Sequence, residues 1–334
     1  MVETVATCHT HDLGDPKHLK SMASIVRTFF SGFKNEKPKF NDSSSMTCKG
    51  LSDSWDCESS FNLEESLTQK YGTCKQIIGS GGLSTVWLAH GNSTATTRKS
   101  FAVKGFRRSS GGDETDFKTR LRDEYLLLSS IKHPNIIRSY ELVENRKGSL
   151  FAILEFCESG DLHSLILRRG QLTTIEADCF MVQMMRGVNF LHENGIAHRD
   201  LKPENMMLTK FGVVKIADFG ESERFRVGDV DLAMVGGVCG SSPYIAPEVY
   251  TSTHYSARAA DVWAMGVIYM VMRLGRYMWF TAEMTDSHYA RYVNQRKTEE
   301  GYPQIEAVGK VSSYPTLVHL SIMFKSAFTN TSIG

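Results

Sequence analysis

Four polar side chains near the middle of the chain have the types and spacing that phosphoryl transfer needs. Asp200, Lys202 and Asn205 lie within the string HRDLKPEN, and Asp218 opens the tripeptide DFG shortly after it. One carboxylate can orient and deprotonate a hydroxyl, while the second carboxylate and the amide can hold Mg²⁺ on the phosphates of ATP. Because a string of this length essentially never arises by chance, it predicts chemistry with ATP and Mg²⁺.

Both strings resemble the catalytic loop and the metal-binding motif of eukaryotic protein kinases. The resemblance implies that Asp200 accepts the proton of the substrate hydroxyl and that Lys202 neutralises charge on the transferring group. It assigns Asn205 and Asp218 to the metal ions. A Lys at position 202 is typical of serine/threonine kinases, so the expected substrates are proteins with Ser or Thr acceptor sites.

Upstream, a glycine-rich stretch predicts a strand, a turn and a second strand. The turn contains Gly79, Ser80, Gly81 and Gly82, where the missing side chains allow backbone N–H groups to approach phosphates closely. Alone, this pattern fits a plain hairpin equally well. A β-rich run further on, FAVK, ends in Lys104, which the resemblance places on the α- and β-phosphates.

A helix is expected over residues 117–131, where apolar residues recur with helical spacing. Glu124 lies in this helix, at the position that the resemblance gives to the acid pairing with Lys104. That pair would aim the ammonium at ATP. The alternative is a solvated helix face, because charged residues flank Glu124.

The resemblance also implies an adenine pocket between two lobes. The apolar run at residues 150–154 predicts a buried strand, and residues 155–161 would form the hinge after it. Backbone groups of Glu155 and Cys157 would hydrogen-bond the base, and Asp161 would meet the ribose or a basic substrate residue. The base itself would lie between three apolar side chains: Val86, Ala102 and Met207.

Arg199, directly before the catalytic Asp, normally requires an anionic partner on the segment after DFG, often a phosphate. Between residues 220 and 239, Ser222 is the only hydroxyl residue. Two interpretations stay open, an acidic residue in place of the phosphate or phosphorylation of a serine. The candidates are Asp229 and Asp231 for the first, and Ser241 and Ser242 for the second. The first is favoured, because Ser241 matches the hydroxyl that contacts the catalytic Asp in kinases.

Motifs in the second half of the chain narrow the family. The strings GVCGSSPYIAPE, ADVWAMGVIYM, YARY and EEGY follow one another between residues 237 and 302. Together they resemble the fungal halotolerance and nitrogen-permease-reactivator kinases. This resemblance, which covers about residues 71–310, implies a serine/threonine kinase that regulates nutrient and ion transporters of the plasma membrane.

The fold implied by the resemblance is α+β, a two-lobed protein kinase fold. A small β-rich lobe with one helix would span residues 71–155 and a larger, mainly helical lobe residues 162–310, with ATP in the cleft. The apolar run at 263–272 is shorter than the about 20 residues that a bilayer requires, so it predicts a buried helix. Asp261, just before this run, would brace the catalytic loop through its backbone.

Residues 1–70 are expected to form a largely disordered extension. Residues 41–60 are rich in Ser and Asp and too poor in apolar side chains to offset the entropy of ordering. Over residues 17–34, apolar and basic side chains recur with helical spacing, which predicts a basic amphipathic helix. This helix could bind an anionic membrane surface or a transporter. A transient helix in a disordered tail is the alternative.

Composition excludes other classes of protein. The 334 residues are 41% hydrophobic and 22% charged, as in ordinary soluble proteins, and the net charge of +1 gives no general attraction to nucleic acid. Seven Cys without a CxxC pair, and no secretory leader, predict reduced thiols. We therefore expect a cytoplasmic protein, peripheral at the plasma membrane if its extension binds lipid.

The last residues depart from the kinase pattern. Residues 311–334 form an atypical tail where kinases have helices, and no Arg follows Arg296. Glu248 thus lacks its expected partner, and a buried carboxylate that loses its partner typically costs about 3–5 kcal/mol. A splice form, a gene-model error or a destabilised protein would each give this pattern. Two hypotheses follow: an active kinase, or a nucleotide-binding protein that is a scaffold of weak activity or a dominant-negative truncated kinase.

Overall fold

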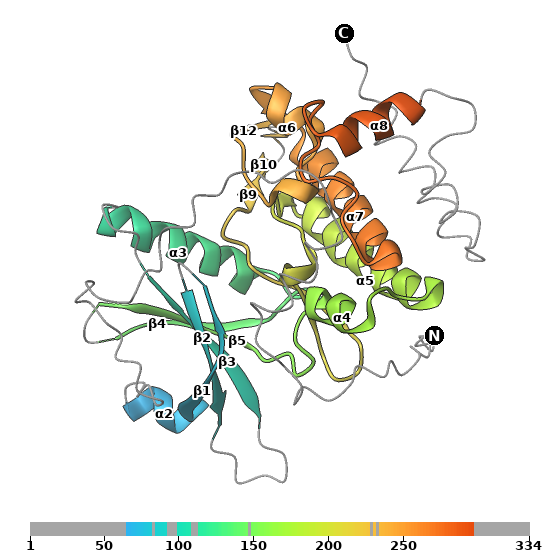
Figure 1. Cartoon of the computed structure of the whole chain (residues 1–334). Coiled ribbons are helices and arrows are strands. Elements are labelled where there is room, and N and C mark those ends of the chain that lie inside the picture. Colours follow the sequence, from blue (N-terminus) through green and yellow to red (C-terminus); the bar gives the residue numbers. More distant parts are fainter. Residues whose placement is uncertain are drawn as a thin grey trace, which may run out of the picture.

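The computed structural model shows two lobes, a sheet with one long helix beside it and a mainly helical lobe (Figure 1). It describes residues 65–296 except for short gaps at 82–83, 92–98, 108–112, 146–147, 228–229 and 232–233. The α+β, two-lobed fold expected from the sequence is confirmed. The basic helix predicted at 17–34 and the tail at 311–334 lie outside the described residues.

The small lobe is built on a five-stranded sheet in the order β1-β2-β3-β5-β4, with antiparallel neighbours. The strands are β1 (Thr73–Ser80), β2 (Ser84–His90), β3 (Ser100–Phe106), β4 (Ser139–Glu144) and β5 (Leu150–Glu155). In β2 and β3 every second residue is buried, because successive side chains of a strand point to opposite faces. Trp87, Val103 and Phe151 belong to the apolar core on one face, which leaves the other face for the cleft.

A helix, α2 (Glu65–Tyr71), begins before the predicted start of the small lobe at residue 71. Lys70 Nζ and Tyr71 Oη each lie 2.6 Å from Glu141 Oε2, on β4. Gly72 then turns the chain into β1 with a φ of 85°, and a Cβ there would lie 1.7 Å from a backbone oxygen of β2. These contacts tie the start of the lobe to its far edge strand.

The predicted helix over 117–131 is confirmed as α3 (Glu114–Ser130). It starts three residues earlier than predicted because the Asp113 carboxylate accepts hydrogen bonds from the backbone N–H groups of Thr115 and Asp116, at 2.7 and 3.1 Å. Its buried face carries three leucines: Leu121, Leu127 and Leu128.

The large lobe contains the longer helices and several short strand pairs. Its helices are α4 (Leu162–Arg169), α5 (Thr174–Glu193), α6 (Pro247–Thr251), α7 (Ala257–Leu274) and α8 (Ser287–Arg296). The strand pairs are β6 (Ile196–Ala197) with β9 (Glu223–Arg224), β7 (Met206–Leu208) with β8 (Val214–Ile216), β10 (Arg226–Val227) with β11 (Val230–Asp231), and β12 (Val235–Gly236) with β13 (His254–Tyr255). The predicted buried helix over 263–272 lies within α7. Across the described residues, no helix combines the length and apolarity that crossing a bilayer would require.

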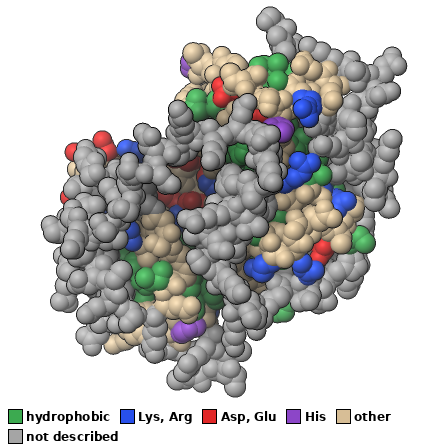
Figure 2. All heavy atoms as spheres, in the orientation of Figure 1, with side chains coloured by type: hydrophobic (Ala, Val, Ile, Leu, Met, Phe, Trp, Pro, Cys, Tyr) green, Lys and Arg blue, Asp and Glu red, His purple; other side chains and the backbone are tan. Residues whose placement is uncertain are grey.

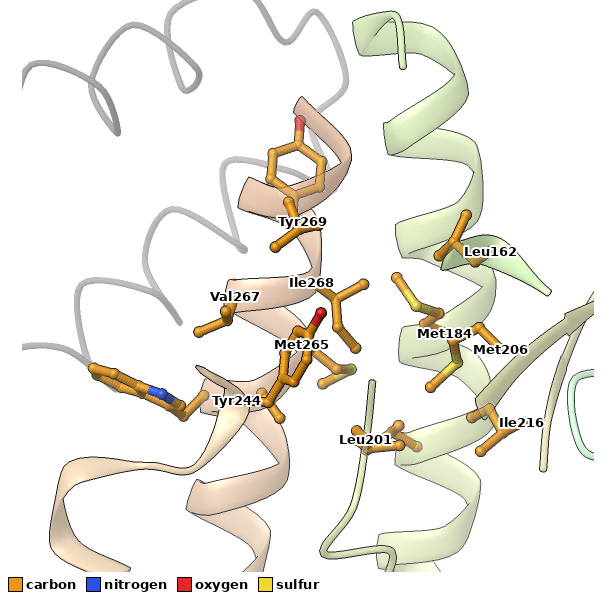
Figure 3. Close-up of a cluster of buried hydrophobic side chains, with 14 of the residues drawn as sticks. Leu162, Met184, Leu201, Met206, Ile216, Tyr244, Met265, Val267, Ile268 and Tyr269 are labelled. Carbon is orange, nitrogen blue, oxygen red and sulfur yellow. The ribbon is translucent and has the colours of Figure 1, made fainter. Parts of the chain in front are cut away.

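Helices α5 and α7 contribute to a buried apolar cluster against which the central loops pack. Met184 of α5, Met206 of β7, Ile216 of β8 and Ile268 of α7 point toward one another (Figure 3) and are fully buried. Leu201, within the HRDLKPEN string, packs into the same cluster. Because close-packed interiors deform little, the packing of Leu201 in this cluster fixes the positions of the polar residues next to it in the loop.

Glu248, at the start of α6, is half-buried, and burial raises the pKa of its carboxyl group. Within the described part of the chain its carboxylate forms no ion pair.

Asp286 closes the turn before α8 with four backbone hydrogen bonds. Its Oδ1 accepts from the N–H groups of His288 and Tyr289 at 2.8 and 3.1 Å, and its Oδ2 from Phe280 and Thr281 at 2.8 and 3.3 Å. Burial alone would raise the pKa of this carboxyl, but the four N–H donors outweigh burial and lower it. The ionised side chain therefore stabilises the native turn.

Replacing Asp286 with Ala is expected to destabilise the protein by about 0.5–2 kcal/mol at pH 7, as for other lost helix caps. Because the native pKa is lowered, this contribution is present above the ordinary pKa of an Asp and is lost as the pH falls through the native value. Thermal melts of Asp286→Ala and wild type should therefore converge in acid. Asp286→Asn, which cannot titrate, is the control, and a difference in melting temperature that persists unchanged into acid would contradict the assignment.

Candidate active site

The catalytic loop is held from below by one buried carboxylate on α7, that of Asp261, which is 1% exposed. Its Oδ2 accepts the backbone N–H of His198 at 2.9 Å and lies 2.8 Å from Nε2 of His192, while its Oδ1 accepts the N–H of Arg199 at 2.8 Å. Arg199 has a φ of 67°, a left-handed conformation that costs a non-glycine residue about 1–3 kcal/mol. The predicted brace is confirmed, and it holds a strained turn.

Above this brace, the side chains of Asp200, Lys202 and Ser241 form a closed ring of hydrogen bonds, and Asn205 joins it through the Asp200 backbone. Lys202 Nζ lies 2.6 Å from Asp200 Oδ2 and 2.9 Å from Ser241 Oγ, and Ser241 Oγ donates to Asp200 Oδ1 at 3.0 Å. Asn205 Nδ2 donates to the Asp200 carbonyl at 2.8 Å. The Asp200 side chain is only 13% exposed, so its carboxylate is fixed in direction. Three of the predicted catalytic and metal residues thus meet, joined by Ser241.

Asp218 links the two lobes through an ion pair with Lys104 of β3. Lys104 Nζ lies 2.7 Å from Asp218 Oδ1, and the Asp218 side chain is 48% exposed. Asp218 also has a left-handed backbone, with a φ of 66°. Burial would raise the pKa of Asp218, but the nearby Lys104 ammonium outweighs burial and lowers it. This carboxylate is therefore ionised at neutral pH and directed toward the cleft.

Glu124 of α3 does not form the expected ion pair with Lys104 in the described part of the chain. It lies beside that ammonium, and a Cβ at Gly220 would be 3.9 Å from both Glu124 Oε2 and Asp218 Oδ1. Burial raises the pKa of Glu124, and the nearby Lys104 ammonium and Phe219 backbone offset only part of that rise. One ammonium faces two carboxylates, and the one at contact distance is that of Asp218. The alternative of a solvated helix face is excluded, since Glu124 lies half-buried beside these groups.

The sheet offers a flat apolar face where the adenine pocket was predicted. Val86 of β2 lies opposite Lys104, and Ala102 lies opposite Leu154 of β5, so Val86, Ala102 and Lys104 share the face that is not packed into the small lobe's core. Met207, the third predicted side chain, is only partly buried and belongs to β7 of the large lobe.

The glycines at the tip of β1 are not required by packing. A Cβ at Gly79 would meet Val86 at 3.8 Å, an ordinary contact, and a Cβ at Gly81 would lie 4.0 Å from the nearest atom, a carbonyl of Ser84. Ser80 between them is exposed, and Gly82 lies outside the described residues. The packing of the fold therefore does not require glycine at these two positions, and the missing side chains leave room for a ligand to approach the backbone.

The hinge presents its three predicted residues in different ways. The Glu155 N–H donates to the Arg138 carbonyl at 2.9 Å, so it is not available to a base. Cys157 turns its thiol inward, where burial raises its pKa to about 12. Asp161 caps α4 by accepting from the Ser164 N–H at 2.7 Å and from its hydroxyl at 3.0 Å. An interaction of Asp161 with ribose or substrate would compete with this cap.

Acidic and basic side chains lie side by side where the two lobes meet, in the hollow visible in Figure 2. The sequence did not predict one charged residue beside the catalytic loop, Glu223 of β9, which forms an ion pair with Arg199. The sequence offered two acidic candidates for the anionic partner of Arg199. Both lie outside what the structure describes: Asp229 entirely, and Asp231 in its side chain. The requirement of Arg199 for an anion was the signal, but it did not identify which acid answers it.

The Asp261 brace should control both stability and activity. In Asp261→Ala two buried N–H groups lose their acceptor, at about 1–3 kcal/mol each, so the variant should melt lower and lose activity. Asp178→Ala is the matched control, because Asp178 is also a buried carboxylate, bonded to Tyr269 Oη at 2.6 Å and remote from the catalytic loop. It should lower the melting temperature and leave turnover at permissive temperature intact. Unchanged melting and turnover in Asp261→Ala would refute the assignment.

Comparison with known proteins supports the resemblance drawn from the motifs. Residues 73–321 match the protein kinase domain family. The chain is 39% identical over 332 residues to serine/threonine-protein kinase hal4 of Schizosaccharomyces pombe, which covers 93% of this chain and 52% of that protein. It is 42% identical over 248 residues to serine/threonine-protein kinase HAL4/SAT4 of Saccharomyces cerevisiae, covering 72% and 41% of the two chains.

A third relative is a probable serine/threonine-protein kinase, HAL5-like, of Eremothecium gossypii, with 30% identity over 329 residues, 89% of this chain and 47% of the relative. The chain spans about half the length of the curated relatives it matches. Because the family match covers most of its residues and includes every residue of the ring around Asp200, this chain belongs to the protein kinase family, among relatives of the fungal HAL4 and HAL5 kinases.

Proposed function

We propose that this chain is an ATP-dependent serine/threonine protein kinase that transfers the γ-phosphoryl group of ATP to Ser or Thr of protein substrates. The observation that carries the proposal is the ring in which Asp200 is held by Lys202 and Ser241. Such a ring presents a carboxylate of fixed direction beside an ammonium, as acid–base and electrostatic catalysis of phosphoryl transfer require.

Asp200 would orient the substrate hydroxyl and accept its proton at one carboxylate oxygen. Lys202, whose side chain is 22% exposed, would compensate negative charge that develops on the transferring group. Lys104 would contact the α- and β-phosphates from the cleft face of the sheet, where its ammonium is paired with Asp218 and lies beside Glu124. The backbone at Gly79, Ser80, Gly81 and Gly82 would cover the phosphates.

Asn205 and Asp218 are suited to hold Mg²⁺, a hard cation that prefers oxygen ligands. The Asp218 carboxylate is ionised and half-exposed toward the cleft. Asn205 directs its Nδ2 to the Asp200 carbonyl at 2.8 Å, which turns its amide oxygen away from that carbonyl. When bound, Mg²⁺–ATP supplies the phosphoryl group and neutralises part of its charge.

The adenine would lie between Val86 and Ala102 of the sheet and Met207 of β7. Since the Glu155 N–H is already engaged with Arg138, Glu155 would contact the base through its carbonyl, and Cys157 through its backbone. Asp161 stands beside Met207 in an isolated bridge, where ribose binding would require it to release the Ser164 cap.

The acceptor class follows from Lys202 and from the relatives, whose names describe serine/threonine kinases. On the resemblance to transporter-regulating kinases, we propose that the substrates include cytoplasmic segments of ion or nutrient transporters, with the extension over residues 1–70 as the contact to membrane or transporter. Recombinant cytoplasmic transporter segments should be phosphorylated in preference to scrambled versions, and equal labelling of both would remove this part of the proposal.

The decisive test is transfer of labelled γ-phosphate from ATP to a generic basic protein by the full chain. Asp200→Asn should reduce the rate by about 10²–10⁴-fold, the usual contribution of a general base. Asp123→Asn, the same chemical change on the exposed face of α3, should leave the rate unchanged. ATP binding is measured in parallel, and a folded chain that binds ATP and transfers nothing would favour a nucleotide-binding scaffold instead.

A further inference from the structure

Arg199 carries a positive charge into a nearly closed space. Its side chain is 11% exposed, and the backbone next to it is fixed by Asp261. A cation that is removed from water needs a counter-charge and acceptors for its N–H groups, because an unpaired buried charge is strongly destabilising. The identity of that counter-charge decides what the activation segment, residues 218–248, requires to fold.

Glu223 supplies the counter-charge in this structure. Nη1 of Arg199 donates to Glu223 Oε2, and within the described residues no other carboxylate pairs with Arg199. The second terminal nitrogen of Arg199, Nη2, donates to two neutral acceptors, the Gly236 carbonyl at 2.9 Å and Tyr255 Oη at 3.2 Å. One guanidinium thus joins three short strands, β9, β12 and β13.

The pairing of β6 with β9 brings Glu223 to this place. Ala197, two residues before Arg199, lies directly opposite Glu223, and Ile196 lies opposite Arg224. The register therefore sets the carboxylate beside the arginine without help from the longer loop that follows. Tyr255 Oη, on β13, also donates to the Gly237 carbonyl at 3.1 Å and so belongs to the same group of contacts.

Two serines of the activation segment, Ser222 and Ser241, are engaged elsewhere. Ser222, the only hydroxyl residue between residues 220 and 239, donates to the Phe219 carbonyl at 2.6 Å, in the turn after DFG. Ser241 donates to Asp200, in the ring described above. Neither hydroxyl contacts Arg199. A phosphate on either serine would therefore not lie beside Arg199 unless the segment rearranged.

We propose that Glu223 is the built-in anion of the activation segment, a positioning residue that acts through Arg199 and replaces an activating phosphate. The inference rests on the proposed kinase activity and deepens it: the active arrangement of Asp200 and Ser241 forms without phosphorylation of residues 218–248. Loss of the carboxylate leaves a buried cation beside the catalytic loop and releases the carbonyls of Gly236 and Gly237 from their common anchor.

The test compares Glu223→Gln with Glu221→Gln in the full chain, after phosphatase treatment checked by mass spectrometry. Glu221 is the matched control, an exposed carboxylate two residues away. Wild type should keep its activity after phosphatase, whereas Glu223→Gln should lose about tenfold or more in kcat, as when one partner of a buried charge pair is removed. The KM for ATP should change little, since Glu223 does not face the nucleotide site.

Two further readouts separate positioning from simple destabilisation. Glu223 is 44% exposed, so a small carboxylate can reach the position that Glu223→Ala vacates, and added acetate should restore part of its activity without affecting wild type. Amide hydrogen exchange over residues 235–240 should speed up in Glu223→Gln and not in Glu221→Gln.

The proposal is overturned if phosphatase abolishes wild-type activity, or if Glu223→Gln keeps both full activity and wild-type exchange. A wild-type chain that transfers no phosphate contradicts the proposed function instead. In that case hydrogen exchange alone decides whether Glu223 orders the segment, and equal exchange in both variants rules it out.

Discussion

The arrangement of this protein depends on the two hydrogen bonds that the Asp261 carboxylate accepts from consecutive backbone N–H groups at His198 and Arg199. The acceptor sits on α7, the most buried helix, so the polar loop is fastened to the apolar core rather than to other loops. A left-handed residue such as Arg199 persists only where its surroundings over-determine it. The brace makes the position of Asp200 a consequence of core packing.

In the cleft, two lysine side chains lie near three carboxylates, and this imbalance decides how the charges are paired. Lys202 pairs with Asp200 inside the large lobe, and Lys104 pairs with Asp218 across the lobes. Glu124 is left without a cation at contact distance among the described residues, and burial raises the pKa of its carboxyl group. Because ion pairs between partly exposed groups contribute little net energy, a Lys104 that changes partner within this cluster would cost little. The Lys104–Asp218 ion pair that connects the lobes can therefore exchange its carboxylate, whereas the buried hydrogen bonds of Asp261 cannot be replaced in this way.

What the sequence predicted well is local. Asp200, Lys202 and Asn205 stand within six positions, so any fold of that loop brings them close, and the period of two in β2 and β3 put Val86, Ala102 and Lys104 on one face. The partner of Lys104 could not be predicted. Two carboxylates lie near its ammonium, and the difference between their distances to it is too small to follow from residue spacing in a sequence. Glu223 was missed for another reason: its place depends on the register of two-residue strands, which leave no pattern in a sequence.

The choice of a carboxylate over a phosphate has a physical basis in the acceptors around Arg199. A phosphate brings close to two negative charges and three oxygens, enough to satisfy several cations at once. Here a single guanidinium needs one charge, and its second nitrogen already has the Gly236 carbonyl and Tyr255 Oη as neutral acceptors. A second negative charge would have no cation among these contacts to neutralise it. One carboxylate matches the charge of one arginine, and the β12 backbone and Tyr255 Oη accept from its second terminal nitrogen.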